Sequence, residues 1–207
     1  MDAQQAFKIG STAYDAHDFS TAVFHLLPLA IQGHKDAQYL MANMYRWGDG
    51  IDQSPEKSLF FYKAAADQGH ARAALDLFLL LEPTGTSAPP PMQSLQKDAA
   101  ASQHYLGIAV ARFKELAEVG DVEAMSNLGF LYHHGFGVEL DGAEAIRWYT
   151  KAFEGGGHGA SNGLCLVHYE GDPRVRDKAK ARFWYEMTKA FDCQCIGIDE
   201  FEEPTVS

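Results

Sequence analysis

Apolar side chains along this chain recur with the spacing of an α-helix. The clearest example occupies i, i+3, i+4 and i+7, one face of a helix, in Ala145, Trp148, Tyr149 and Ala152. The alanine and the two aromatic residues return 36 residues later, within residues 181–185. We therefore expect an internal repeat in which one helix of each unit buries an aromatic face.

Glycines and capping residues divide the chain into units. The glycines at the unit ends are spaced by 36, 51 and 36 residues, so one unit has 15 additional residues. They are Gly33, Gly69, Gly120 and Gly156. Each should supply the left-handed conformation that ends a helix. The second helix of each unit is expected to begin at a capping residue, in turn Asp18, Ser54, Asp141 and Asp177.

The pattern predicts an all-α protein, a right-handed α-solenoid of about five helix-turn-helix units. The units are expected at about residues 3–34, 35–70, 71–121, 122–157 and 158–191. Residues 83–99 are rich in Pro, Gly, Ser and Thr and are expected to form a mobile loop inserted into the third unit. Residues 192–207 form an acidic tail that either caps the last unit or binds a partner.

Composition and charge restrict the expected ligands and the expected location of the protein. The 207 residues carry 17 Lys and Arg against 28 Asp and Glu, a net charge of −11, so nucleic acid is not expected as a ligand. No run of 18 apolar residues exists, so membrane insertion is not expected. The first residues show no signal peptide, and three cysteines are too few for a disulfide scaffold. We expect a cytoplasmic protein, or a periplasmic or secreted one if a leader has been trimmed.

Two stretches share a specific motif. Residues 124–152 read Ala-x-x-x-Leu-Gly-x-x-Tyr-x-x-Gly-x-Gly-Val, then Asp141, then Ala-x-x-Trp-Tyr-x-Lys-Ala, and residues 37–70 match nearly as well. This motif resembles the Sel-one-like repeat (SLR), a relative of the tetratricopeptide repeat. The resemblance covers about residues 3–191 and weakens where Cys165 and His168 replace the usual Gly and Tyr.

The resemblance implies that the first helices of the units line a concave surface. Carrying that register over gives the candidate partner-binding residues Tyr14, Tyr39, Asn43, Arg46, Trp47, Arg72, Phe130, His133, His134 and Tyr169. Tyr, Trp and Arg are the residues that usually dominate binding energy. Either these side chains bind a protein or peptide, or they pack against one another.

Candidate chemistry is sparse. His133, His134 and His168 could approach one another across stacked units, but a metal site needs three or four converging ligands and no carboxylate completes one. We expect His133 and His134 to be surface residues at a helix end. Cys193-x-Cys195 is too tightly spaced for a zinc knuckle, and the glycines of residues 155–159 follow a helix, which fails the context of a phosphate loop.

Two further features are expected to be structural. The aromatic residues at the repeated positions, Trp148, Tyr149, Trp184 and Tyr185, should pack in the core. The basic stretch of residues 174–182 is expected to be a solvated face, with an anion-docking role left open.

The resemblance implies a non-enzymatic adaptor or scaffold without a cofactor, of a kind often found in bacteria, with an undetermined oligomeric state. An alternative is an immunity protein that neutralises a bacterial toxin, which the acidic charge favours if the toxin is basic. Alternatives from another class are a metal-binding module and a hydrolase or β-lactam-binding protein. The last belongs to disulfide-rich members of the family, and this chain has only three cysteines.

Overall fold

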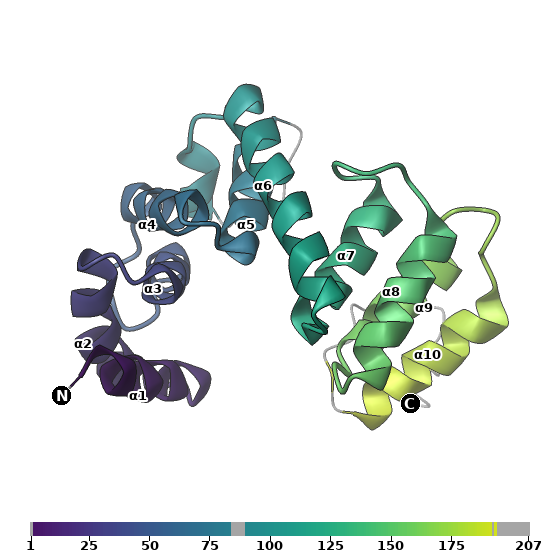
Figure 1. Ribbon diagram of the computed structural model, residues 1–207, viewed down its shortest axis with the longest axis horizontal. Helices are drawn as coiled ribbons and strands as arrows, with labels where there is room; N and C mark the ends of the chain where they lie inside the picture. The colour runs from purple at the N-terminus through teal and green to yellow at the C-terminus, as the bar shows by residue number, and fades with distance from the viewer. Residues whose placement is uncertain (1, 84–89, 192, 194–207) are drawn as a thin grey trace, which may run out of the picture. The chain divides into compact units, whose positions relative to one another are not determined.

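The computed structural model describes residues 2–83, 90–191 and 193, and all regular structure in these ranges is helical (Figure 1). The helices are α1 Ala3–Asp15, α2 Phe19–Ile31, α3 Lys35–Trp47, α4 Pro55–Asp67, α5 Ala71–Leu81, the 3₁₀ helix η1 Pro90–Ser94, α6 Ala99–Glu118, α7 Val122–His134, α8 Gly142–Glu154, α9 Ala160–Tyr169 and α10 Lys178–Ala190. The expected all-α class, an α-solenoid, is confirmed.

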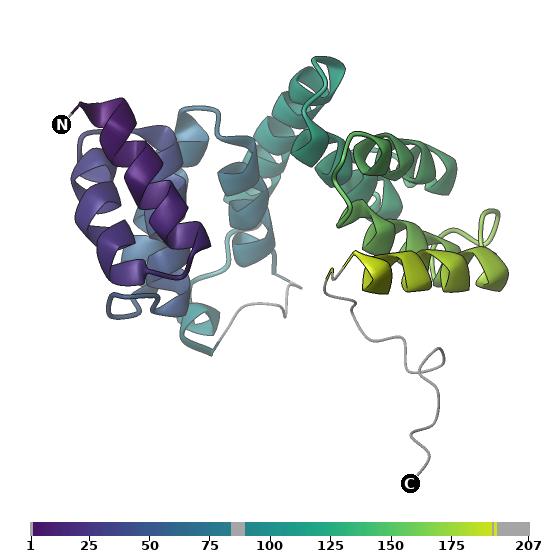
Figure 2. The same cartoon turned by 90° about the horizontal axis from the view of Figure 1, so that it is seen from below.

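The chain divides into two compact units. Unit 1 is Met1–Arg112 and unit 2 is Phe113–Ser207, so the boundary falls within α6. In unit 1, α1 pairs with α2 and α3 with α4, while α2 also packs on α3 and α4 on α5 (Figure 2). In unit 2, α7 pairs with α8, α9 with α10, and α8 packs on α9. Within each unit, consecutive hairpins thus pack on one another, as in repeat arrays.

The sequence signals for helix ends are confirmed. The predicted capping side chains each accept a backbone N–H of the first helical turn, and these are Asp18, Ser54, Asp141 and Asp177. Pro55 occupies the first helical position of α4. The four glycines at the unit ends all have φ between 78° and 96°, which favours glycine over residues with a Cβ.

The inserted segment contains a short 3₁₀ helix that its composition did not predict. Residues 84–89 lie outside the described residues, but residues 90–94 form η1, which contacts α4. Met92 within η1 is fully buried. The segment expected to be a loop over residues 83–99 therefore contains a short helix with one buried apolar side chain. The predicted tail of residues 192–207 lies outside the described residues apart from Cys193.

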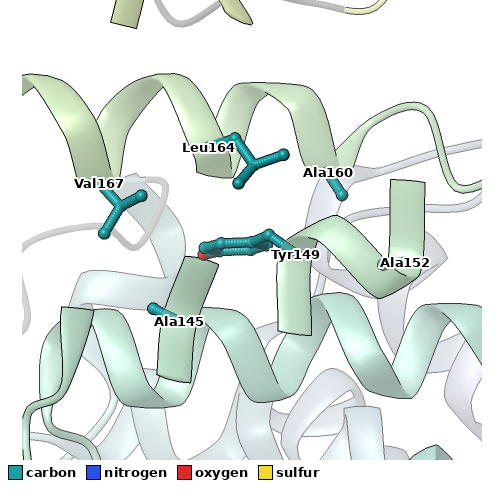
Figure 3. Close-up of a cluster of buried hydrophobic side chains, with 6 residues drawn as sticks. All are labelled: Ala145, Tyr149, Ala152, Ala160, Leu164 and Val167. Carbon is teal, nitrogen blue, oxygen red and sulfur yellow. The ribbon is translucent and has the colours of Figure 1, made fainter. Parts of the chain in front are cut away.

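The core of unit 2 illustrates how the repeated positions pack. Tyr149 of α8 is buried with its ring facing Leu164 of α9 (Figure 3). A Cβ built on Gly129 of α7 would lie 2.7 Å from that ring, so glycine there permits the close approach of α7 and α8. Tyr149 and Tyr185 are core residues as predicted, whereas Trp148 and Trp184 are only half-buried.

Candidate functional site

The candidate residues of unit 1 lie on the first helices of three consecutive hairpins, α1, α3 and α5. We call the surface formed by Tyr14, Tyr39, Asn43, Arg46, Trp47, Arg72 and Asp76 the unit-1 site. Trp47 is exposed, and the other predicted members, Tyr14, Tyr39, Asn43, Arg46 and Arg72, are half-buried. The structure thus brings six predicted residues together with Asp76, which the sequence analysis missed.

Aromatic stacking joins these first helices. Phe7 of α1 stacks on His34 with ring centroids 4.5 Å apart, and Tyr39 of α3 stacks on His70 at 4.4 Å. His34 and His70 are the N-caps of α3 and α5, and the Nδ1 atom of each accepts a backbone N–H. Burial lowers the pKa of His70, which favours the neutral ring that capping requires. An aromatic ring on the first helix of one hairpin therefore holds the histidine that caps the first helix of the next hairpin.

A charged cluster lies at the centre of the unit-1 site. Arg46 Nη1 lies 3.4 Å from Asp76 Oδ1, and Arg72 Nε lies 3.5 Å from Asp76 Oδ2. Burial raises the pKa of the Asp76 carboxyl, against the opposing effect of the two guanidinium groups. Arg46 also lies over the ring of Trp47, with its Cζ 5.1 Å from the centroid. One carboxylate is thus shared by two cations.

Tyrosines surround this cluster. The buried Tyr62 hydroxyl donates a hydrogen bond of 2.6 Å to Asn43 Oδ1. Burial raises the pKa of Tyr62 and that of Tyr14, and Asp49, Asp15 and Asp76 raise the pKa of Tyr14 further. Both phenols therefore stay protonated at neutral pH and can donate hydrogen bonds.

The sequence contained a signal for Asp76 that we did not use. Asp76 is the one acidic residue of helix α5, Ala71–Leu81, whose other residues are apolar apart from Arg72, and a charge in such a run needs a partner when it is buried. The spacing of Arg72, four positions earlier on the same helix, predicts one such ion pair. The pairing with Arg46 could not be predicted, because Arg46 lies 30 positions earlier in a different hairpin.

In unit 2, the candidate residues Phe130, His133 and His134 lie at the end of α7. His134 is exposed, its Nδ1 lies 3.0 Å from the Phe130 carbonyl oxygen, and its ring stacks on Phe136. His133 is buried, so its prediction as a surface residue is wrong. Burial, with a smaller contribution from His134, lowers the pKa of His133 to about 4, which keeps the imidazole neutral at pH 7.

The remaining candidates do not join these groups. Tyr169 packs beside the buried cluster of Cys165 and Tyr185 in the last hairpin. His168 is buried, with Nδ1 2.9 Å from the Val175 carbonyl oxygen. Across the part of the chain that the structure describes, no three His, Cys, Asp or Glu side chains are grouped so that they could hold a metal ion.

Other features carry less chemistry. A cavity of about 550 Å³ in unit 1 is lined by Leu59, Lys63, Leu81 and residues 96–99, none of which is a predicted site residue. In the basic stretch, exposed Arg174 pairs with Asp172 at 2.5 Å, and Lys180 lies 3.9 Å from Asp177. Among the described helices, none has the length and apolar character needed to cross a membrane.

Comparison with known sequences identifies the repeat. The Sel1 repeat family matches residues 35–70, 122–157 and 159–188. A component of an ERAD-associated E3 ubiquitin-protein ligase from Candida glabrata, HRD3, is 24% identical over 83% of this chain. An exopolysaccharide production negative regulator from Rhizobium meliloti is 25% identical over 74% of it. The matched regions span only 23% and 57% of those two relatives.

Comparison with solved structures supports the same fold. The crystal structure of a Sel1 repeat protein from Oxalobacter formigenes aligns with 91% of this chain and 69% of its own, with a TM-score of 0.56. Its sequence is 24% identical over the alignment, so the likeness concerns the fold alone.

Proposed function

This chain is a Sel1-like repeat protein, and from that premise we propose that it is a non-enzymatic interaction module that holds a partner protein or peptide on the unit-1 site. Sel1 repeat proteins typically bind protein partners, and none of the matched families is catalytic. An adaptor or scaffold role fits that general property. The partner of this particular chain is a separate question, which the relatives' names do not answer.

The observation that carries the proposal is the composition of the unit-1 site. It combines exposed Trp47 and half-buried Tyr39 with the guanidinium groups of Arg46 and Arg72. Aromatic residues and arginines on rigid helices are the usual centres of binding energy, because they offer a large contact area at a low entropic cost. The N-cap stacking of His34 and His70 holds α1, α3 and α5 together, so these side chains are preorganised.

The features of unit 2 support this assignment to unit 1. His133 is buried and Tyr169 packs within its own hairpin. His134 and Phe130 remain as a smaller aromatic surface with Phe136. Unit 1, in contrast, supplies the arginines and the exposed tryptophan.

Affinity capture followed by reconstitution tests the proposal. The wild-type protein, a Tyr39→Ala/Trp47→Ala variant and a Phe60→Ala variant are compared as baits. Phe60 is a matched control because it is an exposed aromatic residue of α4 in the same unit, outside the unit-1 site. Circular dichroism establishes that all three proteins are folded.

The captured partner is then purified and titrated by calorimetry. We expect the double variant to bind at least about tenfold more weakly than the wild type, and Phe60→Ala to bind normally. Equal binding by the double variant would remove the unit-1 site as the binding surface. A loss caused by Phe60→Ala alone would assign binding to the second helices instead.

A further inference from the structure

Helix α2, Phe19–Ile31, exposes apolar side chains on its outer face. Phe24, Pro28 and Ile31 lie at i, i+4 and i+7, so they share one side of the helix, and all three are exposed. We call these three residues the α2 stripe. Phe24 is 75% exposed and Ile31 is 71% exposed. The opposite side, which includes Leu26, is buried, and α2 packs on α1 and α3 (Figure 1). The helix is therefore apolar on the side that it exposes as well as on the side that it buries.

The equivalent face of a helix in unit 2 is charged. α2 and α8 are each the second helix of a hairpin, and they begin after the N-caps Asp18 and Asp141. When these N-caps are aligned, the α2 stripe corresponds to three exposed residues of α8, Arg147, Lys151 and Glu154. A hairpin of this fold therefore does not need apolar side chains at these positions. In α2 they remain available for another contact.

Helix α2 also has no charged residue. Among the described α-helices, only α2 and α9 contain no Asp, Glu, Lys or Arg, and α9 packs on α8 and α10. The polar residues beside the α2 stripe, Ser20 and Gln32, are exposed and uncharged. An apolar centre without charges, surrounded by polar residues, is typical of the central part of a protein–protein interface.

Charge indicates which molecule fits this surface. The chain has a net charge of −11, so two copies repel one another wherever their acidic surfaces meet. At the α2 stripe two copies can meet without placing like charges opposite each other. A basic protein, in contrast, would gain no electrostatic attraction from α2 itself. The absence of charge therefore favours a second copy of this chain.

We propose that this chain forms a homodimer through the α2 stripe, with the two copies of α2 packed antiparallel about a two-fold axis. Phe24 of each copy then faces Ile31 of the other copy. The compact ring of Pro28 lies between these two side chains along the helix, near the axis, where it lets the helices approach closely. The antiparallel arrangement also opposes the two helix dipoles, which is electrostatically favourable.

The exposed area is consistent with a weak dimer. From their exposed fractions, Phe24 and Ile31 together present roughly 250 Å² to solvent, so two copies would bury about 500 Å² through these side chains. A standard interface buries about 1,600 Å² in total. The stripe therefore supplies about a third of such an interface, and flanking residues of α2 add to it. We expect a dissociation constant in the micromolar range.

The dimer surface is distinct from the unit-1 site. The α2 stripe lies on the second helix of the first hairpin, whereas the unit-1 site uses the first helices α1, α3 and α5. A dimer thus carries two copies of the unit-1 site. A binding partner with two recognition segments would bind such a dimer more tightly than it binds a monomer.

Sedimentation equilibrium of the full chain, from low-micromolar to several hundred micromolar concentration, tests the dimer. The wild type is compared with Phe24→Glu, Ile31→Lys and the matched control Phe183→Glu. Phe183 is exposed and occupies the position of α10 that is equivalent to Phe24, when the N-caps Asp18 and Asp177 are aligned. Circular dichroism establishes that all four proteins are folded.

We expect the wild type to dimerise, Phe24→Glu and Ile31→Lys each to weaken the dimer at least about tenfold, and Phe183→Glu to leave it unchanged. A wild type that stays monomeric at every concentration would overturn the inference, whether or not the variants fold. Equal weakening by Phe24→Glu and Phe183→Glu would mean that only the general charge matters. A dimer that none of the substitutions affects would place the contact elsewhere.

A mixture of the two stripe variants tests the antiparallel arrangement. In a mixed dimer, the introduced carboxylate of one copy faces the introduced ammonium group of the other, and the second contact keeps the original Phe24 and Ile31. We expect the mixed dimer to form about tenfold more tightly than the dimer of either variant alone. No gain in the mixture would overturn the antiparallel arrangement.

These experiments are independent of the capture experiment. The Tyr39→Ala/Trp47→Ala variant should dimerise as the wild type does, and loss of its dimer would assign the contact to the unit-1 site instead. A monomeric wild type that still captures a partner through Trp47 would leave the proposed function intact and overturn this inference alone.

Discussion

Arg46 lies in the last turn of α3, and His133 lies in the last turn of α7, 87 residues later. The same interval relates the other members of the two sites. Arg72 and Asp76 correspond to Gly159 and Gly163, Asn43 to Phe130, and Tyr62 to Tyr149. Unit 1 therefore has a charged cluster where unit 2 has a neutral imidazole and two glycines.

The difference shows that a buried charge and its counterion have to change together. In unit 1 the counterion of Arg46 comes from the following hairpin, in Asp76. In unit 2 the equivalent position is Gly163, where any Cβ would overlap the ring of Tyr149. A carboxylate therefore does not fit at position 163, and the buried side chain at position 133 has to be able to lose its charge. His133 meets this requirement, because its pKa of about 4 keeps the imidazole neutral at pH 7.

The largest effect is expected when the carboxylate of unit 1 is introduced at the equivalent position of unit 2. We expect Gly163→Asp to lower the unfolding free energy of unit 2 by about 4 kcal/mol, through overlap with Tyr149 and an unpaired buried charge. Gly159→Arg is the matched control, since a Cβ there meets no atom within 4 Å. Urea denaturation, monitored by the fluorescence of Trp148 and Trp184, measures the unfolding free energy of both variants. A loss below about 1 kcal/mol for Gly163→Asp would refute the role given to Gly163.

The converse experiment removes the carboxylate from unit 1. We expect Asp76→Asn to destabilise unit 1 by about 3 kcal/mol, because Arg46, whose side chain is only 13% exposed, loses its counterion. The contact of Arg72 with water moderates the loss. Asp52→Asn, at an exposed position in the same unit, should change little. Trp47 fluorescence during denaturation reports on unit 1, and equal curves for the two variants would contradict the role given to Asp76.

A smaller effect is expected in the pH dependence of the stability of unit 2. The pKa of His133 is about 4 in the folded protein and ordinarily 6.5, so between these values the unfolded chain binds more protons. The stability of unit 2 is therefore complete above pH 6.5 and falls as the pH decreases towards 4. Allowing for the residual solvent contact of the ring, we expect a loss of about 1.5 kcal/mol between pH 7 and pH 5.

His133→Asn isolates this contribution. Burial also lowers the pKa of His70, so protonation of His70 destabilises unit 1 as the pH falls, and the fluorescence of Trp148 and Trp184 has to be used to follow unit 2. An unchanged pH dependence in His133→Asn would show that His133 is not the titrating group.

The smallest effect is expected at the equivalent tyrosines, Tyr62 and Tyr149. Tyr62→Phe removes the hydrogen bond to Asn43 and should cost about 1 kcal/mol. Tyr149→Phe should cost almost nothing, because its hydroxyl makes no hydrogen bond within the described residues and Phe130 stands where Asn43 does in unit 1. Equal costs, measured by urea denaturation, would mean that the two tyrosines stabilise their units in the same way.

Local signals account for the parts of the fold that were predicted correctly. A cap such as Asp141 bonds to backbone groups two and three residues away, and the aromatic face of α8 repeats at i, i+3 and i+4. Both interactions lie within one helical turn, so the sequence pattern contains them completely. The grouping of Tyr39, Asn43, Arg46 and Trp47 also followed from one register on one helix.

Local sequence patterns were sufficient to predict the repeat, its helices and their ends. Packing between helices, in contrast, brings Asp76 to Arg46, buries His133 while His134 stays exposed, and buries Met92 of η1. Each of these depends on packing between elements distant in the chain. A charge or an imidazole is stable in such a place only if another helix supplies its partner or excludes one, and no local pattern records that.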